Sequence, residues 1–254
     1  MTAETLCNQV VLITGAGRWP GPALALAFAG AGATVIANDL SPVLLDPLAE
    51  AAQTLPGQIH PYVADATRGM PLRAMLEEIS AERGQINVLV NNPRIMPEAS
   101  LLEMDEWDWQ RTLEMNLNGP FLISKLVAGQ MRELGNGTIL NLVDTNPQAL
   151  TAPGRSAYAA SQAGFLAFSQ AAAQELIAYN IRVFTLCPEF EVLYPTDLIE
   201  QTRPTTGISP HPSEALTRLA VFLSGPAASH LPGQIFRVGC QQSIPQPDQQ
   251  REQG

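Results

Sequence analysis

Lysine is the residue that this sequence most nearly lacks. Lys125 is the only one, beside 13 arginines, and the formal net charge of the 254 residues is −10. An acidic chain disfavours nucleic acid or an anionic membrane as a partner, because both attract positive charge. The acidity therefore indicates little more than good solubility. A catalytic group that needs a lysine has only this one residue to draw on.

Cysteine and histidine are nearly as rare, with three residues of each. The cysteines show no metal-binding or redox spacing, and an odd number argues against a disulfide framework. The histidines are scattered in the same way, so we expect no metal site. These six residues are Cys7, Cys187, Cys240, His60, His211 and His230.

Long hydrophobic runs are absent as well. Hydrophobic residues make up 46% of the chain, but no run of about 18 apolar residues indicates a transmembrane helix. The first ten residues, MTAETLCNQV, lack the basic segment and the apolar segment of a signal peptide. We therefore expect a cytoplasmic protein with no membrane partner.

Short runs rich in β-branched residues alternate with longer helical patterns along most of the chain. Nearly continuous apolar strands that alternate with helices indicate a parallel sheet covered on both faces. Right-handed crossovers then give a doubly wound, Rossmann-type α/β fold. We expect seven strands, at residues 10–14, 34–38, 59–64, 87–92, 137–143, 181–187 and 233–238.

No internal repeat or linker divides the chain, so we expect one domain over residues 1–244. Residues 245–254, PQPDQQREQG, are polar and rich in glutamine, and we expect a disordered tail there. Two long helices are predicted at Asp105–Leu134 and Ser156–Tyr179. The second has small residues on most faces, which suits either a subunit interface or close packing of the helix within the domain.

The segment VVLITGAGRWPGPALALAFAGAG, residues 10–32, reads as a strand, a glycine turn and a helix. In that context the turn indicates a dinucleotide site, because its N–H groups and the positive helix end would face a pyrophosphate. Asp39 ends the next strand, where a carboxylate can bind ribose hydroxyls and would repel a 2′-phosphate. It therefore favours NAD over NADP, unless it is only an ordinary acidic residue at a strand end.

Five segments in order, TGAGRWPG, NNPR, MNLNGPF, YAASQ and CPE, resemble the landmarks of the short-chain dehydrogenase/reductase family. The resemblance covers roughly residues 6–243. It implies a Rossmann-type domain, an NAD(P)-dependent oxidoreductase activity and a homodimer or homotetramer. A mixed oligomer with an active relative is a further option.

The glycine turn departs from the family's TGxxxGxG pattern at its centre. Trp19 occupies the middle glycine position, where an indole would crowd the phosphates, although the divergent enoyl reductases bind dinucleotide without that glycine. Arg94 replaces a small residue and could contact phosphate, fill the cofactor site or lie in solvent. The cofactor residues that the resemblance implies are Thr14, Gly15, Gly17, Arg18, Trp19, Gly21, Asp39, Asp65 (near the adenine), Asn91 and Pro188.

The family's catalytic group is Asn, Ser, Tyr and Lys, and this chain has only part of it. Asn116 and Tyr158 match the asparagine and the tyrosine that serves as general acid/base. The serine position is Asp144, with Thr145 next to it, and the lysine position is Gln162. The chain's one lysine lies on the other long predicted helix, so no shift along the tyrosine helix supplies the missing cation.

These two replacements act in the same direction on the tyrosine. An unperturbed tyrosine has a pKa of about 10, and in the family a neighbouring lysine lowers it so that the phenol can shuttle protons. An ionised Asp144 nearby would raise it instead. A loss of about 3 pKa units corresponds to roughly 4 kcal/mol. We expect slow or absent alcohol oxidation and a smaller loss in ketone reduction, because a neutral phenol can still donate a proton.

Three functions remain open. The first is an oxidoreductase with an atypical site, in which Asp144 acts as a base or Thr145 replaces the serine hydroxyl. The second is a non-catalytic binding or assembly subunit, motivated by departures that would all line one cleft: Trp19, Pro93, Arg94, Asp144, Gln162 and Glu189. The third resembles the halohydrin dehalogenases, whose Ser–Tyr–Arg set this chain does not match. Residues 193–210 correspond to the substrate lid.

Overall fold

The computed structural model of the chain describes residues 6–188, 212–231 and 233–239. The predicted tail at 245–254, the predicted lid at 193–210 and Glu189 lie outside the described residues. None of the helices within these ranges is long and apolar enough to cross a membrane.

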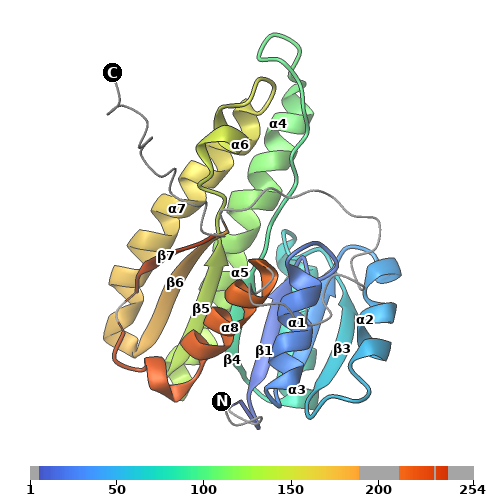
Figure 1. Ribbon diagram of the computed structural model, residues 1–254, viewed down its shortest axis with the longest axis vertical. Coiled ribbons are helices and arrows are strands. Elements are labelled where there is room, and N and C mark those ends of the chain that lie inside the picture. The colour runs from blue at the N-terminus through green and yellow to red at the C-terminus, as the bar shows by residue number, and fades with distance from the viewer. Residues whose placement is uncertain (1–5, 189–211, 232, 240–254) are drawn as a thin grey trace, which may run out of the picture.

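Seven parallel strands form one sheet in the order β3-β2-β1-β4-β5-β6-β7 (Figure 1). Strands β1 and β5, on either side of the central strand β4, are buried along their whole length, as their largely apolar sequences predict. The strands are β1 Val10–Thr14, β2 Thr34–Asp39, β3 Gln58–Val63, β4 Ile86–Asn91, β5 Gly137–Leu142, β6 Ile181–Pro188 and β7 Ile235–Val238. The predicted doubly wound fold is confirmed.

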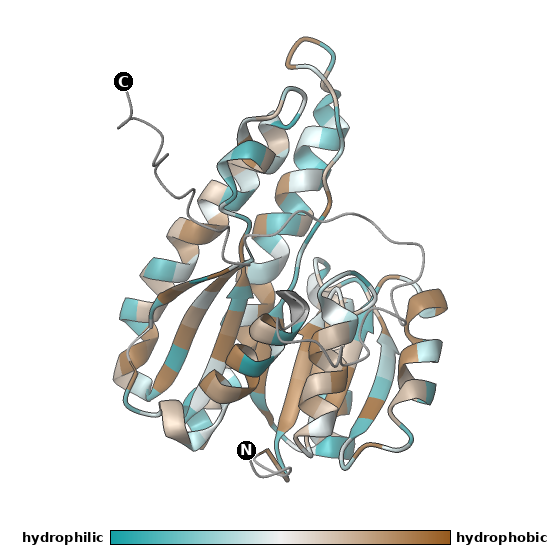
Figure 2. Ribbon diagram, in the orientation of Figure 1, coloured by the Kyte–Doolittle hydropathy of each residue, from teal (hydrophilic) through white to brown (hydrophobic). Residues whose placement is uncertain are grey.

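Helices cover both faces of the sheet. One hydrophobic cluster packs α1, α2 and α8 on one face, and a second packs α3, α5 and α7 on the other. Figure 2 shows the strands as largely hydrophobic and the outer helix surfaces as more hydrophilic. The helices are α1 Gly21–Gly30, α2 Asp46–Ala51, α3 Gly69–Arg83, α4 Glu106–Leu113, α5 Gly119–Leu134, α6 Pro147–Thr151, α7 Ser156–Leu176 and α8 Pro212–Ser224.

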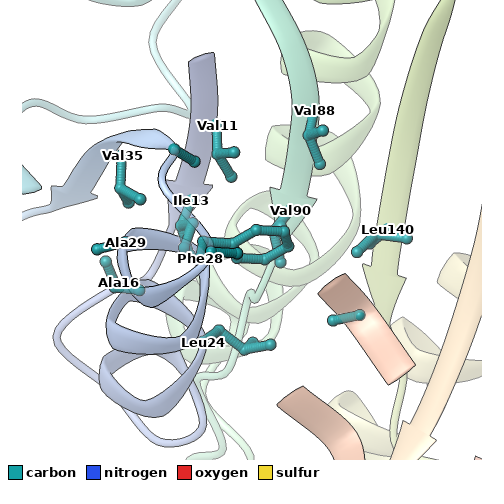
Figure 3. Close-up of a cluster of buried hydrophobic side chains, with 14 of the residues drawn as sticks. Val11, Ile13, Ala16, Leu24, Phe28, Ala29, Val35, Val88, Val90 and Leu140 are labelled. Atoms are coloured by element: carbon teal, nitrogen blue, oxygen red, sulfur yellow. The ribbon is translucent and has the colours of Figure 1, made fainter. Parts of the chain in front are cut away.

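Phe28 of α1 anchors the first cluster. Its ring is fully buried, and Figure 3 shows it beside Ile13 of β1 and Val90 of β4. Burying a phenylalanine side chain stabilises a fold by about 1.5–3 kcal/mol. This contact fixes α1, and with it the glycine turn before it, against the two strands where the strand order reverses.

The long helix predicted over Asp105–Leu134 is divided by a π-helical turn, η2, at Glu114–Asn118. The Asp105 carboxylate caps its start by accepting a hydrogen bond from the Trp107 backbone N–H at 2.7 Å. The wider turn inserts one residue into the helical repeat, and such turns often mark functional sites. Here it buries the side chain of Asn116 completely.

Candidate active site

Two neighbouring cavities open at the carboxyl ends of the strands, on either side of the reversal between β1 and β4. Ligands bind at this place in open α/β sheets. The turn cavity, about 210 Å³, is lined from the ends of β1, β2 and β3 and includes Gly15 and Asp39. The tyrosine cavity, about 430 Å³, is lined from the ends of β4, β5 and β6 and includes Tyr158. The two cavities share residues 92–94.

The glycine turn is held closely against the end of β4. Gly15 has φ +63°, and a Cβ atom there would lie 2.3 Å from the Asn92 carbonyl oxygen. The Asn92 side-chain amide donates to the carbonyls of Gly15 (2.9 Å) and Arg18 (3.0 Å). A Cβ at Gly21 would lie 2.6 Å from the Gly15 carbonyl oxygen. Glycine is therefore required at both positions, one by conformation and both by space.

The N–H groups of this turn are largely used within the protein. Gly17 N–H donates to Asp39 Oδ2 at 3.1 Å, and Arg18 N–H donates to the Gly15 carbonyl at 3.1 Å. Gly21 N–H donates to the Arg18 carbonyl at 2.6 Å. The expectation that these turn amides face a pyrophosphate is therefore wrong for these three groups, because the tight turn has already satisfied them.

Several of the predicted cofactor residues lie beside the turn cavity without lining it. Trp19 lines neither cavity, whereas its neighbour Pro20 lines the tyrosine cavity. Asp65 accepts from Thr67 N–H and lies 3.8 Å from Arg68 Nε. Thr14, Gly15, Arg18 and Asp39 do line the turn cavity.

Asn91 is buried below the site and not in it. Its amide donates to Ser124 Oγ at 2.9 Å and to Asn141 Oδ1 at 2.8 Å. The adjacent Asn92 is the residue that lines both cavities. The alternation of side chains along β4 puts neighbouring asparagines in different surroundings, a distinction that the NNPR motif did not make.

Tyr158 lies in the tyrosine cavity as predicted. Its side chain is 1% exposed, and its hydroxyl donates a hydrogen bond to Asp144 Oδ2 at 3.0 Å. The other carboxylate oxygen, Oδ1, accepts from the Asn146 backbone N–H at 2.9 Å. The residue at the family's serine position is thus an acceptor for the tyrosine, whereas a serine hydroxyl can both donate and accept.

Gln162, at the position of the family's lysine, makes a hydrogen bond that holds two segments of the chain together. Its Oε1 accepts from the Asp144 backbone N–H at 2.8 Å, which links α7 to the loop after β5. The side chain is 2% exposed and lines the tyrosine cavity. Among the described residues its Nε2 has no hydrogen-bond partner.

Arg94 supplies a cation that the motif comparison did not place. Its Nη2 lies 3.9 Å from Asp144 Oδ2, and its side chain is only 19% exposed, so the alternative of a solvent position is excluded. It lines both cavities at their junction. The pairing joins residues fifty positions apart, and only the approach of the two loops after β4 and β5 creates it.

Asn116 is fully engaged in holding the loop after β4. Its Oδ1 accepts from Ile95 N–H at 2.9 Å, while its Nδ2 donates to the Ile95 carbonyl at 2.8 Å and to Ser161 Oγ at 3.1 Å. It therefore positions the residues next to Arg94 and does not itself line either cavity.

Two remaining candidates have simple placements. Thr145 does not line the tyrosine cavity, and its buried Oγ1 has no partner among the described residues. The structure therefore does not bring it to the position expected for a substitute serine. Pro188, at the end of β6, does line the tyrosine cavity.

The described residues fit a dinucleotide at the adenosine end. A carboxylate and a guanidinium suited to ribose hydroxyls and to phosphate, those of Asp39 and Arg18, both line the turn cavity. The side chains that would hold the cofactor are thus Asp39, Arg18 and Arg94, with Gln162 and Pro188 at the far end. Within the described residues, no group of three or more metal-ligating side chains exists.

Comparison with known proteins agrees with this architecture. Residues 9–205 match the short chain dehydrogenase family. The chain belongs to this family. It is 35% identical over 237 residues to the 3-oxoacyl-(acyl-carrier-protein) reductase FabG of Thermotoga maritima, a match that covers 91% of this chain and 96% of that relative.

Two further relatives show the same extent of similarity. The 3-oxoacyl-(acyl-carrier-protein) reductase of Synechocystis sp. is 31% identical over 251 residues, covering 94% of this chain and 97% of the relative. A short-chain type dehydrogenase/reductase from Mycobacterium marinum has a TM-score of 0.81 at 28% identity, covering 94% and 97% of the two chains. Membership implies NAD or NADP as the cofactor.

Proposed function

We propose that this short-chain dehydrogenase binds NAD and has an altered proton-transfer site, which makes it weak or inactive in alcohol oxidation and less impaired in ketone reduction. The observation that carries the proposal is the hydrogen bond from the Tyr158 hydroxyl to Asp144 Oδ2 at 3.0 Å. Relatives named as 3-oxoacyl reductases support ketone reduction as the reaction class.

The chemistry follows from where the proton of Tyr158 lies. When bound, the nicotinamide supplies or accepts the hydride. In reduction, the tyrosine must turn its hydroxyl from Asp144 to the substrate oxygen and donate the proton there. In oxidation, it must first become a phenolate beside a carboxylate, and the repulsion between two like charges opposes that step. Reduction is therefore the less impaired direction.

Arg94 offsets part of this repulsion. Its guanidinium, 3.9 Å from Asp144 Oδ2, places one positive charge beside the carboxylate. A lysine on α7 would stand one turn after Tyr158 and act on the phenol itself. The arginine thus stabilises the acceptor of the proton and does not replace the missing lysine.

The preference for NAD rests on Asp39, which lines the turn cavity. A carboxylate can accept hydrogen bonds from ribose hydroxyls and repels a 2′-phosphate. Asp39 Oδ2 already accepts from Gly17 N–H and Oδ1 from Leu40 N–H, yet each carboxylate oxygen can accept a second bond. The residue can therefore hold the turn and a ribose together.

Titration of the protein with NADH and with NADPH, followed by nicotinamide fluorescence, tests the proposal. We expect saturable binding of NADH and weaker binding of NADPH. No saturable binding of either up to millimolar concentration would contradict it and would favour a non-catalytic subunit instead. The observation that favours that second function is the position of Arg94 at the junction of the two cavities, through which a dinucleotide must pass.

The same experiment can separate the two functions. If the Arg94 side chain closes the passage, Arg94→Ala gains NADH binding that the unmodified protein lacks. If the passage is open, the substitution leaves NADH binding similar or weaker. A function like that of the halohydrin dehalogenases is excluded if the protein releases no halide from a simple haloalcohol.

Self-association is proposed through α5 and α7. On this face Phe121, 47% exposed, meets Phe168 edge to face at a centroid distance of 6.0 Å. A cavity of about 510 Å³ between the two helices makes a hollow on this face. Light scattering of purified protein tests for a homodimer or homotetramer, and co-purification with an active relative tests for a mixed oligomer.

A further inference from the structure

One arginine of the turn cavity is half-buried and has no charged partner. Three arginines line this cavity: Arg18, Arg94 and Arg111. Arg18 is exposed, and Arg94 lies 3.9 Å from Asp144 Oδ2. Arg111, near the end of α4, is half-buried, and its side chain makes no ion pair or hydrogen bond with any described residue. A guanidinium loses hydration when it is partly buried, so a ligand in the cavity is what can offset that loss.

The acidic residues nearest to Arg111 do not neutralise it. Asp108 and Glu114 lie three positions before and after it, a spacing at which side chains on a helix can meet. Glu114 instead lies 3.8 Å from Arg68 Nη1. Asp108 forms no ion pair within the described part of the chain. Asp39 lines the same cavity, but both of its carboxylate oxygens accept from backbone N–H groups.

Arg111 shares one wall of the cavity with Met115. The two residues are four positions apart, so they lie on the same face of the helix, and both line the turn cavity. Figure 1 shows α4 rising from the carboxyl edge of the sheet as a continuation of α5. The next residue, Asn116, is buried and holds the loop after β4. The helix therefore presents Arg111 and Met115 to the cavity, while Asn116 builds the loop.

The base of a bound nucleotide falls at this wall. A ribose at Asp39 has two neighbours, the phosphates and the base. The phosphates of a dinucleotide lead toward the tyrosine cavity, through the junction at residues 92–94. The base then lies on the side of β3, which is separated from β4 by two strands. The residues that line the cavity from the loop after β3 and from the α4–α5 helix are largely apolar and include Ala64, Ala66, Met115 and Ile123.

We infer that Arg111 binds the adenine base by stacking its guanidinium on the ring, and that it helps to select the base. A guanidinium is planar, stays charged and stacks on aromatic faces. The face of the ring attracts a cation, so it takes the place of the acidic partner that Arg111 lacks. The inference rests on the proposed function in that it places a nucleotide in the turn cavity. It concerns the adenosine end alone, and binding, not turnover, is the readout.

Calorimetric titration with AMP, and with ribose 5-phosphate as the matched compound without a base, tests the inference. Both compounds need only the turn cavity, so the result does not depend on whether Arg94 closes the passage between the cavities. We expect AMP to bind at least about ten-fold more tightly than ribose 5-phosphate. Equal affinities, or no saturable binding of AMP up to tens of millimolar, would overturn the inference.

Two substitutions separate stacking from a contact between charges. Arg111→Tyr keeps a flat side chain and removes the charge, whereas Arg111→Lys keeps the charge and removes the plane. We expect Arg111→Tyr to bind AMP within about three-fold of the unmodified protein and Arg111→Lys to bind it about ten-fold more weakly, because only the tyrosine can stack. The reverse pattern would assign Arg111 to the phosphate. That pattern, a loss in both variants or a loss in neither would each overturn the inference.

The same two changes at Arg132 are the matched controls, because Arg132 lines the α5–α7 cavity and not the turn cavity. Arg132→Tyr and Arg132→Lys should both retain AMP binding, and thermal unfolding shows whether each variant is folded. A separate NADH titration distinguishes the two proposals. If AMP binding depends on Arg111 but NADH does not bind, the proposed function fails and the inference stands. If NADH binds but AMP binding does not depend on Arg111, only the inference fails.

Discussion

The two halves of the carboxyl edge differ in how far they depart from the family. At the turn end, Gly15, Gly21 and Asp39 are kept, and the backbone is closed by internal hydrogen bonds. At the tyrosine end, Asp144 and Gln162 replace the serine and lysine, and they contact each other through backbone and side chain. The comparison shows that the turn keeps the family's residues where close backbone packing requires them. At the tyrosine end, the two proton-transfer positions hold other residues, and these are hydrogen-bonded to each other.

The largest expected effect is at the turn end. Gly15→Ala forces a Cβ to within 2.3 Å of the Asn92 carbonyl at φ +63°. We expect the free energy of unfolding to fall by at least roughly 2 kcal/mol, since backbone strain alone costs about 1–3 kcal/mol. Urea unfolding measures the loss.

The matched control for that change is Gly129→Ala, in the interior of α5, where a Cβ meets nothing within 4 Å. It should raise the free energy of unfolding by about 0.4–1 kcal/mol. A similar loss in both variants would mean that the turn is no more constrained than an ordinary helix, and the comparison between the two halves would fail.

The next effect restores the tyrosine end. In Asp144→Ser with Gln162→Lys, the carboxylate is removed and a cation is placed one helical turn after Tyr158. We expect alcohol oxidation with NAD to rise by about 100-fold over the unmodified protein, the lower end of what general acid–base catalysis contributes. Rates over a panel of secondary alcohols measure it.

Gln162→Lys alone should gain less, because it leaves Asp144 in place and removes the acceptor of its backbone N–H. Gln148→Lys adds a lysine at an exposed residue of the same cavity and serves as the control. No gain in the double variant, despite NADH binding, would show that Asp144 and Gln162 are not what limits alcohol oxidation.

A smaller effect concerns cofactor choice. Asp39→Asn removes the charge that opposes a 2′-phosphate but keeps an oxygen for Gly17 N–H. We expect the ratio of NADH to NADPH affinity to fall about ten-fold, or about 1.4 kcal/mol. Asp46→Asn, at an exposed position of α2, should leave the ratio unchanged. An unchanged ratio in Asp39→Asn would assign Asp39 to the turn alone.

The smallest expected effect is a pH dependence of the free energy of unfolding, which comes from His60 on the edge strand β3. Burial lowers the pKa of His60 below 6.5, and Arg83 lowers it further. The unfolded state therefore binds the proton more readily, so stability is complete above pH 6.5 and decreases as the pH falls through the folded value. Urea unfolding at pH 8 and pH 5 should show a smaller decrease in His60→Gln. His230→Gln, an exposed histidine, is the control, and an equal pH dependence in both variants would contradict the assignment.

Much of the fold could be predicted because its signals are local. The runs of apolar residues placed all seven strands to within two residues at their ends, for instance 59–64 against the observed Gln58–Val63. The π-helical turn at Glu114–Asn118 was not predicted, since one extra residue in a long helix leaves hardly any trace in a hydrophobic pattern. The burial of Asn91 and the exposure of Asn92 to both cavities likewise needed the strand register.

The sequence predicted which residues belong to the candidate site, but only some of the contacts between them. Spacing put Asp144 and Tyr158 in one site, and their hydrogen bond agrees. Trp19 and Thr145 were placed there as well, but neither lines the cavity. A side chain next to a motif position can point into the core or away from it, and the sequence holds no measure of that direction.

The sequence by itself determined the family, the parallel sheet and the absence of the catalytic serine and lysine, because these depend on residue identity and on short periodic patterns. Tertiary structure decided that Arg94 stands beside Asp144, that Tyr158 donates to that carboxylate and that Gln162 Nε2 has no partner within the described part of the chain. Those partners come from three segments that only the carboxyl edge of the sheet brings together. Hydrogen bonds between such segments depend on distances of a few tenths of an ångström, which folding sets and sequence spacing does not.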